Sequence, residues 1–265
     1  NVSPFPSALA HPINAISSMI VYSSAMERPQ FITPALSILL DAVRAIAALL
    51  VLGGHAVQME IYTGPYPFGP TVQHYAVIVF FVLSGLVIAH SVNAGNYTLR
   101  DYAIARAARI VPVSLFAVAF STAIYLALAS RGLTPLVAPD LYNQFSLEAV
   151  LLPVLFLSES GDGVGPLWNP PYWSLTYEVW FYALFAAGLF LKGTRRIVVL
   201  ALLCWLAGWR ILVMMPIWLI GAALVRYGTV WEPARTTHAI ILALAALVMM
   251  SLSRIYAFDA QPLMF

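Results

Sequence analysis

The sequence has few charged residues. Only 13 Lys and Arg and 11 Asp and Glu occur among 265 residues, which is 9% of the chain, whereas about a quarter is usual in soluble domains. So few charges cannot cover the surface of a water-soluble domain of this length. A formal net charge of +2 also provides no basic face of the kind that nucleic-acid binding needs. We therefore expect neither a soluble domain nor a nucleic-acid partner.

Cysteine is almost absent as well. Cys204 is the single cysteine, so the sequence has no internal disulfide, no Cys-x-x-Cys motif and no set of thiolate metal ligands. Its histidines lack the close spacing of a metal-binding set. The sequence thus predicts no metal site and no bound cofactor.

Apolar residues, by contrast, make up 62% of the chain. A helix that crosses a bilayer needs about 20 mostly apolar residues, and seven stretches approach that pattern. The segment Leu147 to Leu157 is too short to span and is expected to be re-entrant or interfacial. The sequence predicts an all-α, polytopic transmembrane helix bundle of about seven spans, at residues 35–59, 75–91, 110–130, 173–191, 197–209, 211–225 and 239–252.

The predicted organisation is one transmembrane domain over residues 34–265. Residues 1–33 are expected to form an N-terminal segment, interfacial or disordered, without a secretory signal. Residues 197–226 fit either two tight short spans or one long tilted helix, because Arg210 alone separates their two apolar runs. Pro216 is expected to kink the second of these runs.

The distribution of Lys and Arg predicts the orientation of the bundle. Cytoplasmic loops collect these residues, and a cytoplasmic N-terminus puts seven of them inside and Arg131 alone outside. We therefore expect an integral protein of a bacterial inner (plasma) membrane with its N-terminus in the cytoplasm. The seven inner cations are Arg28, Arg100, Arg106, Arg109, Lys192, Arg195 and Arg196.

Ionisable residues within the predicted spans are rare, and each is a candidate site residue because a charge in the bilayer costs at least roughly 2.5–3.5 kcal/mol. The first span contains Asp41, Arg44 and His55. The spacing between Arg44 and His55 places them about 20° apart around a helix and about 16 Å apart along it. We therefore expect both to face one cavity from different depths.

Two interpretations remain open for each of these residues. Asp41 and Arg44 either serve a site or form an i,i+3 ion pair near the inner interface. His55 is either a base that exchanges a proton near neutral pH or a neutral ring bound to a backbone carbonyl.

The second and third spans add small and basic residues. Ser84 and Gly85 interrupt a bulky run, which by itself favours close helix packing. Arg106 and Arg109 are three positions apart and are expected to share a helix face. Such a pair can bind phosphate oxygens, although ordinary positive-inside topology also accounts for it.

The stretch that follows Pro170 and Pro171 contains an acid at membrane depth. Ser174 and Glu178 form an i,i+4 pair on one helix face. Trp173 and the neighbouring aromatic residues fit an interfacial belt, but a belt does not explain Glu178. An ionisable carboxyl at this depth needs a partner, and we expect His55 or an arginine of the same cavity.

Four stretches, in this order, resemble the acyltransferase family 3 membrane proteins, which O-acylate surface polysaccharides, lipopolysaccharide and related glycans. The arginine and histidine of the first are Arg44 and His55, and the acid of the fourth is Glu178. The stretches are LDAVRAIAALLVLGGHA at 40–56, FFVLSGLVI at 80–88, ARAARIVP at 105–112 and YWSLTYEVWFY at 172–182.

The resemblance implies an enzyme that takes an acyl group, usually acetyl, from cytoplasmic acyl-coenzyme A. It delivers that group to a hydroxyl of a glycan or lipid-linked sugar on the outer side of the membrane. Membrane lipids surround the protein. His55 would be the essential histidine, a general base or acyl relay, with Arg44 and Glu178 as catalytic partners. Arg106 and Arg109 would lie near the donor phosphates, and the remaining expected substrate contacts are Asp41, Ser84, Trp173 and Ser174.

The sequence departs from the family pattern at several places. Family members commonly have about ten spans, whereas this sequence carries about seven, and Ala45 and Leu86 stand where glycine and phenylalanine are usual. Two other functions therefore stay open. One is a truncated or inactive accessory membrane subunit, and the other is a proton-coupled transporter that uses the intramembrane charges as a path.

Overall fold

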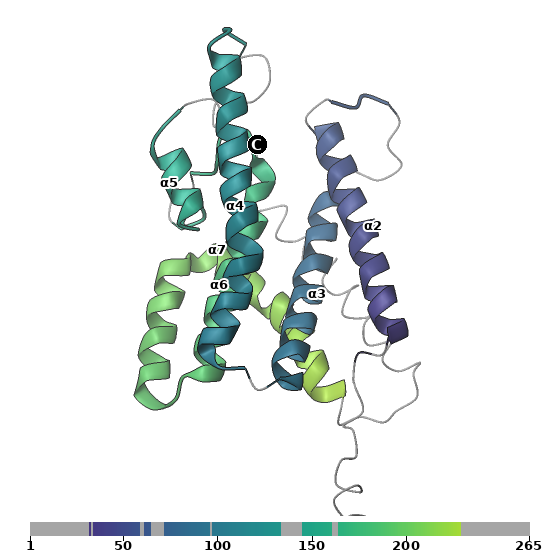
Figure 1. Ribbon diagram of the computed structural model, residues 1–265, viewed down its shortest axis with the longest axis vertical. Coiled ribbons are helices and arrows are strands. Elements are labelled where there is room, and N and C mark those ends of the chain that lie inside the picture. Colours follow the sequence, from purple (N-terminus) through teal and green to yellow (C-terminus); the bar gives the residue numbers. More distant parts are fainter. Residues whose placement is uncertain are drawn as a thin grey trace, which may run out of the picture.

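The computed structural model describes residues 32, 34–58, 61–64, 72–95, 97–133, 145–160 and 164–228. Within these ranges the chain is helical and contains no strand, which confirms the predicted all-α class (Figure 1). The helices are α2 (Pro34–Gln58), α3 (Val72–Ala94), α4 (Leu99–Ala129), α5 (Glu148–Val154), the 3-10 helix η3 (Pro170–Tyr172), α6 (Trp173–Phe190) and α7 (Gly193–Gly228).

The helices coincide with the predicted spans. By length and composition, four of the described helices can cross a membrane, namely α2, α3, α4 and α7. The 18-residue α6 matches the fourth predicted span, although it is not among those four helices. The predicted N-terminal segment over residues 1–33, apart from residue 32, and the predicted span 239–252 lie outside the described residues.

Helix α4 begins eleven residues before the predicted span, because Thr98 and Asp101 form a capping box. The Thr98 hydroxyl accepts a hydrogen bond from the Asp101 amide at 3.2 Å, and the Thr98 amide donates to Asp101 Oδ2 at 3.2 Å. Pro112 lies within the helix. Arg106 and Arg109 are therefore helical residues, as expected, and belong to the same helix as the third predicted span.

Helix α7 is interrupted at Gly208, where the backbone has φ 79° and ψ 165°. This left-handed conformation is easily adopted by glycine, and it divides α7 into two short helices that run in different directions (Figure 1). The Ser160 hydroxyl donates to the Leu206 carbonyl oxygen at 2.8 Å, just before the break. The break lies at Gly208 and not at Pro216, which is inside the second helix.

Side-chain hydrogen bonds connect α5 and the residues that follow it to η3 and α6. Helix α5 has seven residues and does not span, as predicted. Tyr172 donates to the Pro153 carbonyl at 2.8 Å, and the Trp180 indole donates to the Phe156 carbonyl at 2.8 Å. Pro153 lies in the last turn of α5 and Phe156 just beyond that helix. The two bonds therefore join the end of α5 to η3 and α6 and fix where α6 begins.

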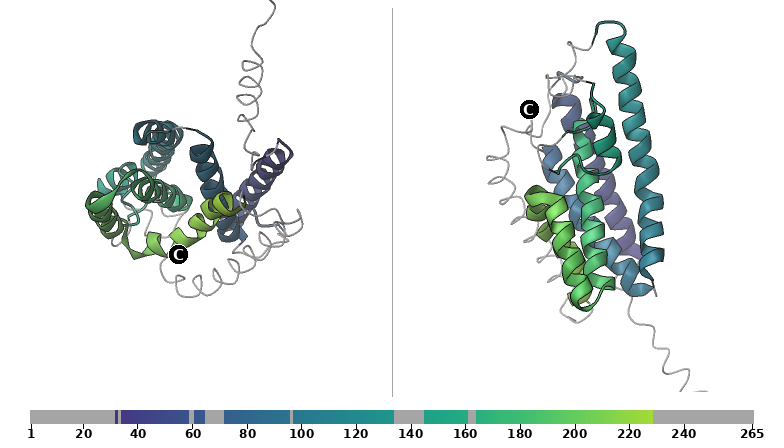
Figure 2. Two further views of the ribbon diagram at one scale, coloured as in Figure 1. Left: turned by 90° about the horizontal axis from the view of Figure 1, so that it is seen from below. Right: turned by 90° about the vertical axis from the view of Figure 1, so that its left-hand side faces the viewer.

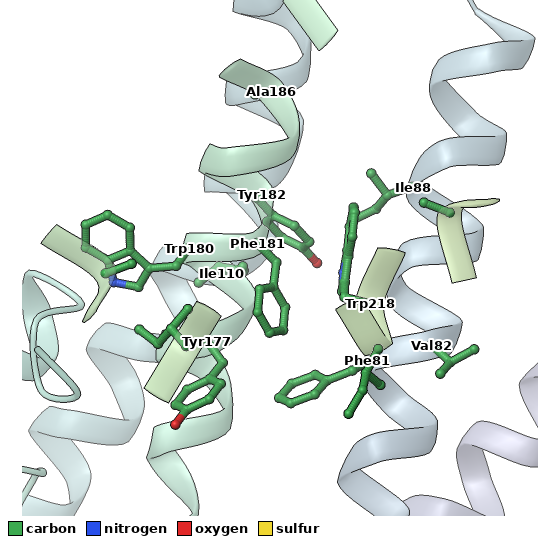
Figure 3. Close-up of a cluster of buried hydrophobic side chains, with 14 of the residues drawn as sticks. Phe81, Val82, Ile88, Ile110, Tyr177, Trp180, Phe181, Tyr182, Ala186 and Trp218 are labelled. Atoms are coloured by element: carbon green, nitrogen blue, oxygen red, sulfur yellow. The ribbon is translucent and has the colours of Figure 1, made fainter. Parts of the chain in front are cut away.

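The main core lies between α3, α6 and α7 and is rich in aromatic rings (Figure 3). Phe81 packs edge-to-face on Phe181 with ring centroids 5.1 Å apart, and Trp218 packs similarly on Phe185 at 5.0 Å. Gly85 of α3 and Gly221 of α7 bring the two backbones together, because a Cβ on either would overlap a carbonyl oxygen of the other helix. Such small residues allow close helix crossings in membranes.

The helices share a common polarity that agrees with the charge distribution. In Figure 1, α3 ends, α4 begins, and α6 turns into α7 at the lower end, where α2 also begins. The predicted inner cations of the described part, from Arg100 to Arg196, belong to these connections, to the part of α4 up to Arg109 or to the first turn of α7. Figure 2 shows α2 at one edge of the bundle beside α3, which is its main contact.

Candidate active site

A cavity of about 220 Å³ lies among α2, α3, α4 and α6. Its polar lining gathers two arginines, a carboxyl group and three hydroxyl groups from these four helices. They are Arg44, Ser84, Arg109, Ser174, Glu178 and Tyr182. The structure thus brings together five of the nine residues predicted for the site, and it adds Tyr182.

Glu178 is the most firmly held of these side chains. Its Oε1 accepts a hydrogen bond from the Ser84 hydroxyl at 2.6 Å and a second, short one from the Tyr182 hydroxyl. Ser174, Glu178 and Tyr182 follow one another at i,i+4 spacing on α6 and all line the cavity. The prediction that Ser174 and Glu178 share a face is therefore confirmed. Among the described residues, Ser84 and Tyr182 hold the part-buried carboxyl, in place of the expected His55 or arginine.

Arg44 lies on α2 and contacts Asp41 on its own helix. The Arg44 guanidinium and Asp41 Oδ1 are 3.3 Å apart, and the side chains are 26% and 68% exposed. Arg44 lines the cavity, whereas Asp41 is not among the residues of its wall. The predicted i,i+3 ion pair is present, and Asp41 touches the site only through Arg44.

His55 lies one turn beyond the cavity on the same face of α2. Val51, which does line the cavity, accepts a hydrogen bond at its carbonyl from His55 Nδ1 at 2.8 Å. Because a carbonyl oxygen only accepts, Nδ1 carries the proton, and in the neutral ring Nε2 keeps the basic lone pair. His74 of α3 lies within electrostatic range of His55. The expected pairing of His55 with Glu178 does not occur in this conformation, because Glu178 bonds Ser84 and Tyr182.

Arg106 and Arg109 point into different cavities. Arg109 lines the cavity that holds Glu178, while Arg106 lines a second, apolar cavity of about 310 Å³ among α4, α6 and α7. The Arg106 guanidinium lies 5.8 Å from the Tyr102 ring centroid and 5.9 Å from that of Tyr182. Tyr182 borders both cavities, so the two arginines do not converge on one point as their spacing had suggested.

Trp173 and Trp218 belong to the aromatic core behind the cavity. Trp173 packs on Phe81 and Tyr177 with centroids 6.2 and 5.1 Å away, and it does not line the cavity. Trp218 donates its indole N–H to Ser84 Oγ at 3.3 Å. No sequence pattern pointed to Trp218, whereas the i,i+4 spacing of Glu178 and Tyr182 was visible but fitted an aromatic belt equally well.

Comparisons with known proteins agree with this arrangement. The chain matches the sequence family described as an acyltransferase domain over residues 38–264. It is 32% identical over 133 residues to the exopolysaccharide production protein ExoZ of Rhizobium meliloti (strain 1021), an alignment that covers 49% of this chain and 39% of ExoZ. It is also 37% identical over 106 residues to protein 2 in the picA locus of Rhizobium radiobacter, covering 37% of this chain and 51% of that protein.

The chain therefore aligns with between 39% and 51% of the length of these curated relatives. No solved structure matches it. The family match, however, covers most of the chain and contains all four stretches on which the resemblance was based, together with every residue of the cavity wall. The chain belongs to the acyltransferase 3 family of membrane proteins.

Proposed function

We propose that this protein is a membrane O-acyltransferase. It moves an acyl group, acetyl in the simplest case, from cytoplasmic acyl-coenzyme A to a hydroxyl of an extracytoplasmic glycan or glycolipid. The observation that carries the proposal is the cavity itself, which gathers Glu178, Arg44 and Arg109 within apolar helices. Because intramembrane ionisable groups are costly, their convergence from three helices favours a functional site over a structural one.

His55 supplies the base in this proposal. The acceptor hydroxyl oxygen attacks the thioester carbonyl carbon while His55 Nε2 takes the hydroxyl proton; the C–S bond breaks, and the proton passes to the departing coenzyme A thiolate. In the relay version, Nε2 attacks the thioester carbon first, the C–S bond breaks and the coenzyme A thiolate leaves. The acceptor hydroxyl then displaces the acyl group from Nε2, and its proton passes to the thiolate. The Nδ1 bond to the Val51 carbonyl supports both versions because it leaves Nε2 as the reactive nitrogen.

The charged groups of the cavity divide the remaining work. Arg44 stabilises the negative charge that develops on the thioester oxygen, which is most effective in a site that excludes water. Arg109 binds a phosphate of the donor, and Arg106 approaches the donor from the other side of Tyr182. Glu178 balances the positive charge that His55 gains, and Ser84 and Tyr182 hold it in place.

The acceptor class and the membrane orientation are part of the proposal. ExoZ is named for exopolysaccharide production, which supports a polysaccharide acceptor here. The inner cations at one end of the bundle support a cytoplasmic N-terminus in a bacterial inner membrane. The donor would then enter near α4, and the acceptor would approach His55 from the opposite end of α2.

The test is acceptor-dependent release of coenzyme A by membrane vesicles that contain the protein, with acetyl-coenzyme A and a native glycan extract. His55→Ala is expected to lower release at least about 100-fold, the usual contribution of a general base, without loss of inserted protein. His90→Ala is the matched control, because His90 lies on α3 outside the cavity wall.

The outcomes separate the competing functions. Near wild-type release by His55→Ala would overturn the role of His55. Absence of release from well-inserted wild type would overturn the enzyme function and favour an accessory subunit. Solute accumulation driven by a proton gradient, without thioester consumption, would favour a transporter.

A further inference from the structure

Trp218 is a fully buried indole from the second half of α7 that reaches the back of the cavity. Its side chain is 0% exposed and packs on Phe181, Tyr182 and Phe185. Figure 3 shows Trp218 facing Phe181 and Tyr182 across the space between α6 and α3. Its one polar atom, Nε1, is 3.3 Å from Ser84 Oγ. The indole is thus the contact between α7 and the hydroxyl that holds Glu178.

The backbone crossing of α3 and α7 fixes the position of this indole. A Cβ on Gly85 would overlap the carbonyl oxygen of Trp218 itself, and a Cβ on Gly221 would overlap the carbonyl oxygen of Val82. Gly85 is the neighbour of Ser84 in the sequence. The two glycines therefore bring the backbone of Trp218 into direct contact with the helix turn that presents Ser84 to the cavity.

The chemistry of the three groups gives their hydrogen bonds one direction. An indole N–H can only donate, so Ser84 Oγ accepts from Trp218. The serine has a single proton, and Glu178 Oε1, at 2.6 Å, is the acceptor in line to receive it. Tyr182 donates to the same oxygen. Among the described residues, no hydrogen bond is made to the other carboxyl oxygen, Oε2.

We propose that Trp218 is a positioning residue of the active site: its indole N–H holds Ser84 so that Ser84 and Tyr182 fix Oε1 of Glu178 and leave Oε2 for the reacting groups. The proposal rests on the proposed function, in which Glu178 balances charge in the cavity. It makes the second half of α7, which contributes no atom to the cavity wall, part of the catalytic machinery.

The test pairs Trp218→Phe with a matched control. Trp218→Phe keeps an aromatic ring in the core and removes only the N–H donor. Trp180→Phe makes the same chemical change at another largely buried indole, whose N–H donates to the Phe156 carbonyl at 2.8 Å, away from Ser84. Each substitution is combined with Ser84→Ala in a double-mutant cycle, so that the coupling between two side chains is measured directly.

Two measurements are made on each variant of the double-mutant cycle. The first is the infrared carboxyl band of Glu178, obtained by difference from Glu178→Gln, which requires no activity. We expect Trp218→Phe to shift this band and Trp180→Phe to leave it unchanged. The second is kcat for acyl transfer, which we expect to fall about tenfold in Trp218→Phe, as for the loss of one hydrogen bond, with KM for acyl-coenzyme A unchanged. In the Ser84→Ala background the same change is expected to have no further effect.

The outcomes distinguish this inference from the proposed function. An unchanged band in Trp218→Phe, or effects on kcat that add fully to those of Ser84→Ala, would overturn the positioning role. A shifted band in a protein that transfers no acyl group would confirm the hydrogen-bond chain but overturn the proposed function, and with it the catalytic meaning of Trp218. A tenfold loss in Trp180→Phe as well would show that core packing, and not the Ser84 contact, sets the rate.

Discussion

The two sides of the cavity are built differently. On one side lie Ser84, Glu178 and Tyr182, with Trp218 behind them, and we call these four residues the fixed wall. Ser84 of α3 bonds Glu178 of α6 and Trp218 of α7, across 94 and 134 residues of sequence. On the α2 wall, the partners of Arg44 and His55 within the described part of the chain are residues three and four positions away on their own helix. In the most apolar 18-residue stretch of α2, 6% of the stretch is buried, whereas 44% of the corresponding stretch of α3 is buried. The acid is thus held by tertiary structure, while the arginine and the histidine are held by one peripheral helix.

This difference separates two requirements of the proposed reaction. Elements with few buried contacts open at lower free energy than the core, so α2 can move relative to α3 without breaking the Glu178 contacts. Arg44 and His55 can exchange their local partners for substrate, whereas Glu178 keeps its position. The α2 wall therefore suits the groups that meet the donor and the acceptor, and the fixed wall suits the group that balances their charge.

The largest expected effect concerns the glycines that hold the two walls to α3. Gly221→Ala is expected to lower the free energy of unfolding by about 3 kcal/mol, because the added Cβ would overlap the backbone of Val82. Gly54→Ala, on α2, is expected to cost less, because the nearest atoms belong to the Gln73 side chain. Thermal unfolding of the purified protein in detergent measures both.

Gly188→Ala is the control for this pair. Gly188 lies within α6 with nothing within 4 Å of an added Cβ, so alanine is expected to be neutral or to stabilise by up to about 1 kcal/mol through helix propensity. Equal unfolding temperatures for Gly221→Ala and Gly188→Ala would contradict the close crossing of α3 and α7.

The next largest expected effect is a dependence of protein stability on pH, caused by the Glu159 carboxyl. Burial raises the pKa of the Glu159 carboxyl from 4.5 to about 7, against the opposing effect of the Arg210 charge. Glu159 lies outside the spanning helices, next to Ser160, which bonds the Leu206 carbonyl. Between pH 4.5 and 7 the folded protein binds this proton more tightly than the unfolded chain. The contribution of Glu159 to the free energy of unfolding is therefore greatest below pH 4.5, and it is lost as the pH rises from 4.5 through 7.

Glu159→Gln is expected to remove this dependence, whose slope is at most about 1.4 kcal/mol per pH unit. Unfolding temperatures measured from pH 4 to pH 8 test it, and the variant is expected to exceed wild type only toward the alkaline end. Glu148→Gln, at an exposed position of α5, should retain the wild-type slope. A parallel pH profile for Glu159→Gln and wild type would show that the carboxyl is not held in its neutral form.

The smallest effect is expected on the α2 wall. Asp41→Asn removes the ion pair with Arg44, but an exposed pair within one helix contributes only about 0.3–0.5 kcal/mol. The free energy of unfolding should therefore change by less than about 0.5 kcal/mol. Ser84→Ala, which leaves the Trp218 indole and Glu178 without their shared partner, should cost about 1–3 kcal/mol. A larger cost for Asp41→Asn than for Ser84→Ala would reverse the assignment of the two walls.

Much of the fold could be predicted because membrane helices follow from composition. The apolar runs predicted α2, α3 and α6 within a few residues, and the short α5 was expected from its length. The start of α4 at Leu99 was missed, because hydropathy begins the third span at Ile110 and does not include the polar residues that follow the capping box at Thr98. Hydropathy could not decide between two short helices and one long helix over residues 197–226, because both contain the same apolar residues. The structure has two short helices, divided by the break at Gly208.

The candidate site was predicted where one helix sets the geometry and missed where two helices meet. The Asp41–Arg44 pair and the shared face of Ser174 and Glu178 follow from spacing within a helix. The partners of Glu178 depend on how α3 and α7 cross α6. The spacing of residues along the sequence does not predict how helices cross. Arg106 and Arg109 separate for the same reason: the small angle between them on α4 is enough for Tyr182 to come between them.

The long sequence separation of the contacts on the fixed wall has a consequence for how the protein is made. Spans enter the membrane in chain order, and N-terminal parts fold first during synthesis. Ser84 is inserted before α6 brings Glu178, and its contact with Trp218 waits for the second half of α7. The α2 wall can form its own bonds as soon as α2 exists. The acid site is therefore completed later in biosynthesis than the α2 wall, and a nascent chain that ends before residue 218 carries the proposed base without a finished acid partner.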